Sequence, residues 1–273
     1  MTLFVVIVNV NIYSQSLLWK ISGNDLPSAS YLYGTIHIKD NRVFEWKDAV
    51  YSRLEQCNLL AGEIDLNNVN ANEMAAQLFL PEGQTLKTIY SPVDYEMIGS
   101  AFKKCSGMDI MLFDRMKPVT LVSVCISAEK EEDMEATVDE LIFRYAADNG
   151  KPVMGIETIG EQMKLLDAIP YEYITGFFRN IDQQKAEMEK LTLIYQKADL
   201  DSIYIMMQEE ESGALINDEL IRNRNYRMAE RTVPIVRRQS VFIAVGAAHL
   251  PGEEGLITLY RKEGFIVEPV SIR

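Results

Sequence analysis

The stretch "YLYGTIHIKD", residues 31–40, is an apolar run that stops at Gly34 and is followed by His37. The stretch "VFIAVGAAHLPGEEG", residues 241–255, repeats this pattern with Gly246 and His249. These are the 2 histidines of a chain of 273 residues. Short apolar runs bounded by glycine are typical of buried strands. A matched pair of Gly-x-x-His motifs, each placed where a strand ends, favours one shared site over two unrelated loop histidines. We expect each glycine to let the backbone turn at the end of its strand.

Both motifs belong to segments with the same expected order of strand, helix and strand. The first segment has strands in residues 30–38 and 58–66 with a helix at about 44–57, and the last has strands in 240–250 and 264–272 with a helix at about 253–263. Between them, a helix, a turn at 149–150, a strand ending near Glu157 and a helix over 159–168 are expected. Strands that alternate with helices predict an α/β fold with a parallel or mixed sheet. We expect two related half-units that form this sheet, surrounded by helices.

Two long stretches show helical periodicity and almost no strand pattern. They cover about residues 71–127 and 172–232. We expect them to form helical layers around the sheet, or a helical insertion that acts as a lid.

The composition and net charge argue against some classes of function. A net charge of −13 argues against binding to a nucleic-acid backbone, which requires a basic face. The acidic run "EKEEDMEATVDE", residues 129–140, is interpreted as the exposed start of a helix. Hydrophobic residues at 48% and charged residues at 25% are ordinary for a globular domain.

The N-terminus predicts export. Residues 3–13, "LFVVIVNVNIY", are too short to span a bilayer but fit the core of a signal peptide, and small residues follow in "SQS" at 14–16. We therefore expect a signal peptide over 1–16, one domain over 17–273, a periplasmic or secreted location, and no stable membrane span after processing. A buried N-terminal strand is the alternative. Cys105 and Cys125 can pair after export or remain buried thiols with Cys57.

Four polar side chains follow the expected strands: His37, Glu63, Glu157 and His249. Ligands of such sheets collect beyond the carboxyl ends of the strands. Two imidazoles with one or two carboxylates can hold a catalytic metal ion while a carboxylate accepts a proton from water. This set predicts a metal-dependent hydrolase. The alternatives are a haem- or metal-binding module without turnover and a metal-free esterase with a histidine base.

Several stretches together resemble the TraB/GumN family, which includes the Tiki metalloproteases. They are "YGTIH", "GEID", "GKPVMGIETIGEQ", "RNYRMAER" and "VGAAHLPGEEGLITLYRKEGFIVEPV", and the resemblance covers about residues 18–270. It implies an α/β fold with two related halves, a peptide or protein substrate, and a divalent metal, with manganese or cobalt favoured and zinc as a further option.

The resemblance also implies roles for individual residues. It places the motif glycines at Gly34 and Gly246, and the metal ligands at His37, Glu63 and His249. Further catalytic positions fall on Glu157, Arg224 and Asn225, with Arg222 and Asn223 as an overlapping register. We assign proton acceptance to Glu157, and an exchange of roles between Glu63 and Glu157 remains open.

Overall fold

The sheet is the centre of the fold. The structure, a computed structural model, describes residues 16–65, 77–127, 133–209 and 218–272. Within these residues one six-stranded sheet has the order β4-β3-β5-β2-β1-β6. Strand β1 is antiparallel to both of its neighbours, whereas β2, β5, β3 and β4 are parallel to one another. The expected α/β fold with a mixed sheet is confirmed. The strands are β1 (Leu18–Ser22), β2 (Ser30–Thr35), β3 (Leu59–Gly62), β4 (Val153–Gly155), β5 (Val241–Gly246) and β6 (Ile266–Val270).

The two motif strands, β2 and β5, are neighbours in the middle of this sheet. Every residue of β2 is buried, and β5 is buried up to Val245. Such uninterrupted burial is expected of parallel strands that are covered on both faces. Thr35 pairs with Gly246, so the two strands end at the same level. The segments that follow them therefore leave the sheet side by side.

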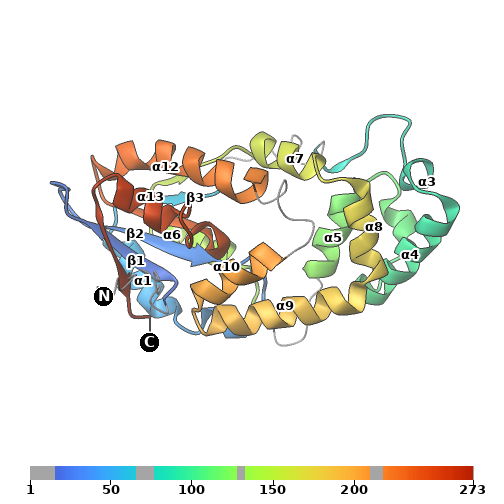
Figure 1. The fold of residues 1–273 in the computed structure, drawn as a ribbon, viewed down its shortest axis with the longest axis horizontal. Helices are drawn as coiled ribbons and strands as arrows, with labels where there is room; N and C mark the ends of the chain where they lie inside the picture. Colours follow the sequence, from blue (N-terminus) through green and yellow to red (C-terminus); the bar gives the residue numbers. More distant parts are fainter. Residues whose placement is uncertain (1–15, 66–76, 128–132, 210–217, 273) are drawn as a thin grey trace, which may run out of the picture.

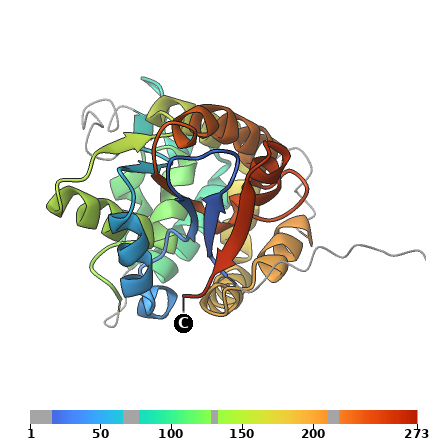
Figure 2. The same ribbon diagram turned by 90° about the vertical axis from the view of Figure 1, so that its left-hand side faces the viewer.

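Helices on both sides of the sheet complete the first hydrophobic core (Figure 1). The helices α1 (Lys47–Glu55), α6 (Val138–Asp148), α12 (Asn223–Val236) and α13 (Leu256–Lys262) surround the strands. The helices α9 (Ile181–Gln196) and α10 (Leu200–Glu209) add Tyr195 and Leu200 to the same core. Figure 2 shows β6, in red, beside the first strands, in blue.

The remaining helices form a separate lobe, built from the segment between β3 and β4 and from part of the segment between β4 and β5. This helical lobe consists of α3 (Leu86–Ile89), α4 (Pro92–Ser106), α5 (Pro118–Ile126) and α8 (Tyr171–Arg179). It has its own core around Phe102, Leu121 and Phe178. In Figure 1 it lies at the far end of the long axis, joined to the sheet by α7 (Ile159–Asp167) and α9. An insertion is therefore found, but the described part of 71–127 does not layer onto the sheet, because its apolar faces pack against each other.

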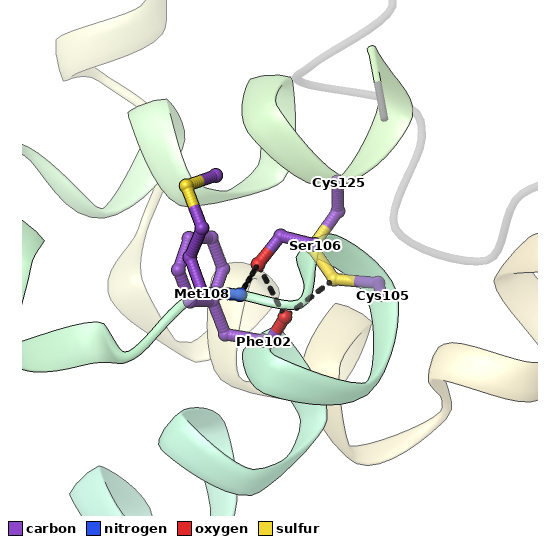
Figure 3. The surroundings of a disulfide bond; sticks show 5 residues. All are labelled: Phe102, Cys105, Ser106, Met108 and Cys125. Carbon is purple, nitrogen blue, oxygen red and sulfur yellow. Dashed lines mark hydrogen bonds between the residues drawn. A yellow bond between two sulfur atoms is a disulfide. The ribbon is translucent and has the colours of Figure 1, made fainter. Parts of the chain in front are cut away.

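A disulfide joins α4 to α5 in the helical lobe (Figure 3). It links Cys105 and Cys125, whose Cα atoms are 5.3 Å apart. Cys57 is a buried free thiol, and burial raises its pKa to about 12. Of the two alternatives for Cys105 and Cys125, the structure has the paired form.

Strand β1 is an element that the sequence reasoning did not assign. Trp19 and Ile21 are buried, and Ser16 donates a hydrogen bond from its hydroxyl to the carbonyl of Val270 at 2.6 Å. The expected signal peptide lies almost wholly in residues 1–15, outside the described residues. In the described parts of the chain, no helix combines the length and apolar character that crossing a membrane requires.

Candidate functional site

Four parallel strands bring the candidate residues to one edge of the sheet. Glu157 follows β4, Glu63 follows β3, His249 follows β5 and His37 follows β2, and these four strands are consecutive neighbours. The pairing of β3 with β4 continues past the strands, because the Glu157 amide donates to the Glu63 carbonyl at 2.8 Å. The carboxyl ends of parallel strands are where ligands bind in sheets of this kind.

Arg224 binds both glutamates. Its Nε donates to the two carboxylate oxygens of Glu157 at 3.1 and 3.0 Å. Its Nη2 donates to Glu157 Oε2 at 2.7 Å and to Glu63 Oε2 at 2.5 Å. The Glu157 side chain is 0% exposed and that of Glu63 is 10% exposed. Buried carboxylates need such charged partners, so Arg224 is what allows two acids to lie together here.

Gln162 and Gly246 hold the Glu63 carboxylate from two further directions. Gln162 Nε2 donates to Glu63 Oε2 at 2.9 Å and to Glu157 Oε2 at 3.2 Å. The backbone amide of Gly246 donates to Glu63 Oε1 at 2.8 Å. Burial raises the pKa of Glu63, but the nearby positive charges of Arg224 and of the histidines when protonated outweigh this and lower it to about 2. Glu63 is therefore a carboxylate anion at neutral pH.

The motif glycines allow neighbouring groups to approach the backbone closely, rather than forming the turn that we expected from them. Gly34 lies within β2, and a Cβ there would come within 2.9 Å of Ala247 Cα. Gly246 has an ordinary negative φ of −51°, and a Cβ there would be 3.3 Å from Glu63 Oε1. A side chain at either position would push the two motif segments, or Glu63, out of place.

His249 is a buried, neutral imidazole with a fixed orientation. Asn225 Nδ2 donates to the Glu254 carbonyl at 2.9 Å, which directs Asn225 Oδ1 toward His249 Nδ1 at 2.6 Å. Nδ1 therefore carries the proton, and Nε2 is left with its lone pair. Burial lowers the pKa of His249 to about 4, although Glu63 opposes this. Its Nε2 is 3.8 Å from Glu63 Oε1.

His37 is the more exposed histidine, with 64% of its side chain accessible. Its Nδ1 is 2.7 Å from Asp139 Oδ2, and the charge of this carboxylate raises the pKa of His37 to about 9. The charge of His37 in turn contributes to the lowered pKa of both Glu63 and His249.

The structure separates the two overlapping Arg-Asn registers. Arg224 and Asn225 are buried on α12 and contact the glutamates and His249. Arg222 is exposed and pairs with Glu254 at 2.9 Å, and Asn223 donates to Glu219 at 3.0 Å. The 3.6-residue helical period explains the difference, since residues two apart lie on nearly opposite faces.

Comparison with known proteins shows the family of the chain. The chain matches the TraB/PrgY/gumN family over residues 17–269. It belongs to this family. Among its relatives, "Metalloprotease TIKI2" of Danio rerio is 23% identical, and the match covers 93% of this chain and 60% of the relative. "Metalloprotease TIKI homolog" of Amphimedon queenslandica is 21% identical over 96% of this chain and 63% of the relative. "Metalloprotease TIKI1" of Homo sapiens is 21% identical over 93% of this chain and 61% of the relative.

The chain thus spans about three fifths of the length of these curated relatives. No solved structure matches the chain. These relatives carry the name metalloprotease, which raises the question of whether the side chains of this site fit a metal ion.

The imidazole nitrogen and carboxylate oxygen atoms of the site are suitable ligands for a divalent metal ion, and one pair of them, His249 Nε2 and Glu63 Oε1, also has a suitable spacing. Metal bonds from nitrogen and carboxylate oxygen are about 2.0–2.2 Å long. The 3.8 Å between His249 Nε2 and Glu63 Oε1 therefore allows one ion to contact both atoms. The hydrogen bond at Nδ1 is the usual support of a metal-binding histidine. Among the described residues, no group of three His, Cys, Asp or Glu side chains is close enough together to hold one ion.

Sequence reasoning missed two residues of this site. Gln162 is in the quoted "GKPVMGIETIGEQ" stretch, but a glutamine in the first turns of a helix has no pattern that distinguishes it from a surface residue. Asp139 lies in an acidic run that we interpreted as a solvated helix start. The Thr137 to Glu140 capping box was the available signal, because it places Asp139 in the first turn of α6.

Proposed function

We propose that this chain is an exported, metal-dependent hydrolase that cleaves peptide bonds. The observation that carries the proposal is the pair formed by His249 Nε2, with its lone pair free of a proton, and Glu63 Oε1 at 3.8 Å. The names of the relatives support the peptide bond as the target. The Cys105–Cys125 disulfide supports export, because such bonds persist in oxidising compartments.

We assign the metal to His37 and His249, which follow the neighbouring strands β2 and β5, and place Glu63 Oε1 beside it, 3.8 Å from His249 Nε2. Manganese, cobalt and zinc ions all suit a set of two imidazoles and a carboxylate. When bound, such an ion lowers the pKa of water and polarises the carbonyl group of the substrate.

The geometry does not favour Glu157 as the group that accepts a proton from water. Its side chain is fully buried, and both oxygens accept hydrogen bonds from Arg224. We therefore propose that Glu157 holds Arg224, that Arg224 and Gln162 fix Glu63 Oε2, and that Glu63 Oε1 is the proton acceptor. The oxygen of water then adds to the peptide carbonyl carbon. The proton passes by way of Glu63 to the amine nitrogen as the C–N bond breaks.

Haem capture without turnover gains no comparable support. A cavity of about 390 Å³ lies in the helical lobe, between α5, α7 and α8. Its lining includes Leu80, Leu166, Ile174 and Tyr171 but neither histidine, so the two imidazoles of the site do not lie against it.

A peptide-cleavage assay tests the proposal. Protein purified without chelator is incubated with a peptide library, then again after EDTA treatment, and after addition of Mn²⁺, Co²⁺ or Zn²⁺. We expect EDTA to stop cleavage and one of these ions to restore it. The Glu63→Gln variant should lose at least 10²-fold in rate, whereas Arg222→Gln, at an exposed ion pair, should not change it. Cleavage that persists in EDTA, or in Glu63→Gln at the wild-type rate, would contradict the proposal.

A further inference from the structure

The two histidines of the site have the same kind of support from opposite sides. His249 Nδ1 is 2.6 Å from Asn225 Oδ1 on α12. His37 Nδ1 is 2.7 Å from Asp139 Oδ2 on α6. In both cases an oxygen on a helix lies close to Nδ1, so Nε2 is the ring nitrogen that remains for another partner. The resemblance in the sequence covers Asn225, whereas Asp139 enters from the structure alone.

Asp139 is itself held in place, unlike the acid of an ordinary surface ion pair. Its Oδ1 accepts a hydrogen bond from the hydroxyl of Thr35, the last residue of β2, which is 1% exposed. The N-cap Thr137 accepts from the Glu140 amide, and Glu140 Oε2 accepts from the Thr137 amide at 2.9 Å. This capping box fixes the first turn of α6, where Asp139 lies. The Asp139 side chain is 14% exposed.

The carboxylate therefore connects the end of β2 to the histidine that follows it. Thr35 and His37 are two residues apart; Asp139 Oδ1 accepts a hydrogen bond from Thr35, and Oδ2 forms the ion-pair contact with His37. This two-point contact sets both the position of the loop after β2 and the rotation of the imidazole ring. An exposed ion pair without such support contributes little, because two long side chains must be ordered for it.

We propose that Asp139 is a positioning residue that fixes the His37 ring with Nε2 presented to a divalent cation, as Asn225 does for His249. This inference rests on the proposed function, because it assumes that His37 is a ligand. A partner oxygen at the second ring nitrogen orients a metal-binding histidine and increases its basicity. Loss of such a partner typically lowers metal affinity 10–100-fold.

Calorimetric titration of the EDTA-treated protein with Mn²⁺, and with Co²⁺ or Zn²⁺ if Mn²⁺ does not bind, tests the inference. We expect Asp139→Ala to weaken the Kd about 10–100-fold. Asp139→Asn should restore most of the loss, because the Asn225 contact shows that an amide oxygen can accept from Nδ1. Asp148→Ala is the matched control. It removes a carboxylate from the exposed last residue of the same helix, so it should leave the Kd unchanged.

The spectrum of the ring protons provides a readout that does not depend on metal. The chain has 2 histidines, so the exchange-protected ring N–H signals in a proton NMR spectrum are few and assignable. The His37 N–H signal should be lost in Asp139→Ala and retained in Asp139→Asn. An Asp139→Ala variant that binds the cation as tightly as wild type, or an Asp148→Ala variant that loses affinity equally, would overturn this inference and leave the proposed function intact. A wild-type protein that binds none of the three cations would instead overturn the proposed function.

Discussion

Replacing Arg224 by methionine removes the cation that two buried carboxylates share. Methionine keeps an unbranched apolar stem at this buried position of α12, so the packing around the helix changes little. Glu157 loses the partner of both its oxygens, and Glu63 loses its shortest hydrogen bond, at 2.5 Å. Removing one partner of a buried ion pair costs about 3–5 kcal/mol, because the remaining charge is left without compensation. We expect the unfolding free energy of Arg224→Met to fall by about that amount.

Arg222→Met is the matched control, two residues away. Arg222 pairs with Glu254 at 2.9 Å, but the two side chains are 48% and 40% exposed. Exposed ion pairs contribute about 0–1 kcal/mol, so this variant should stay close to wild type. Urea unfolding of all three proteins in EDTA measures the difference as a shift of the midpoint at constant slope.

The pH dependence provides a second check on the same cluster. The pKa of Glu63 is about 2 in the folded protein, against an ordinary value of 4.5. A lowered carboxyl pKa stabilises the fold fully above pH 4.5, and this stabilisation is lost as the pH falls toward 2. The gap between wild type and Arg224→Met should therefore be widest above pH 4.5 and narrow below it. If Arg224→Met and Arg222→Met unfold at the same urea concentration, Arg224 does not compensate buried charge and the description of the site is wrong.

Three further outcomes follow from the same structure. The pKa of His249 falls from 6.5 to about 4 on folding, so between these pH values the unfolded chain binds a proton that the folded chain does not. The unfolding free energy in EDTA should therefore rise from about pH 4 to 6.5, and His249→Gln should flatten this slope in urea unfolding. Replacing both Cys105 and Cys125 by serine opens a loop with a separation of 20 residues and should lower the unfolding free energy by about 3 kcal/mol while the Kd for metal is unchanged. Asn225→Leu should weaken metal binding about 10–100-fold in calorimetry, whereas Asn223→Leu, at a partly exposed position two residues away that contacts Glu219, should not.

The sequence predicted the fold class and the family because these depend on local patterns. Buried runs such as those of β2 and β5 are apolar without interruption, and helices alternate with them. Strand β1 escaped assignment because it is five residues long and directly follows the expected leader. The sequence indicated a helical insertion but not that its helices form a separate lobe, since the period of a helix shows that one face is apolar but not what that face packs against.

Within the site, the sequence could indicate only those residues that belong to a short motif with a fixed spacing. The Gly-x-x-His pair and the Arg-Asn pair each have a spacing that can be searched. Asp139 acts through a contact across the fold, 104 positions from Thr35, and an acid in a charged run has the composition of any solvated helix start. The burial of Glu157 against Arg224 was equally hidden, because a glutamate at a strand end is usually solvated.

The number of metal ions bound per chain tests whether His37 and His249 hold a divalent cation. Wild-type protein and a variant with His37→Ala and His249→Ala are dialysed against the same low concentration of Mn²⁺, Co²⁺ or Zn²⁺, and the metal in each is measured by mass spectrometry. The site proposed here predicts one ion per wild-type chain for at least one of these metals, and almost none in the double variant. Equal metal content in the two proteins would show that the ion, if one binds, is held elsewhere, and would contradict the account.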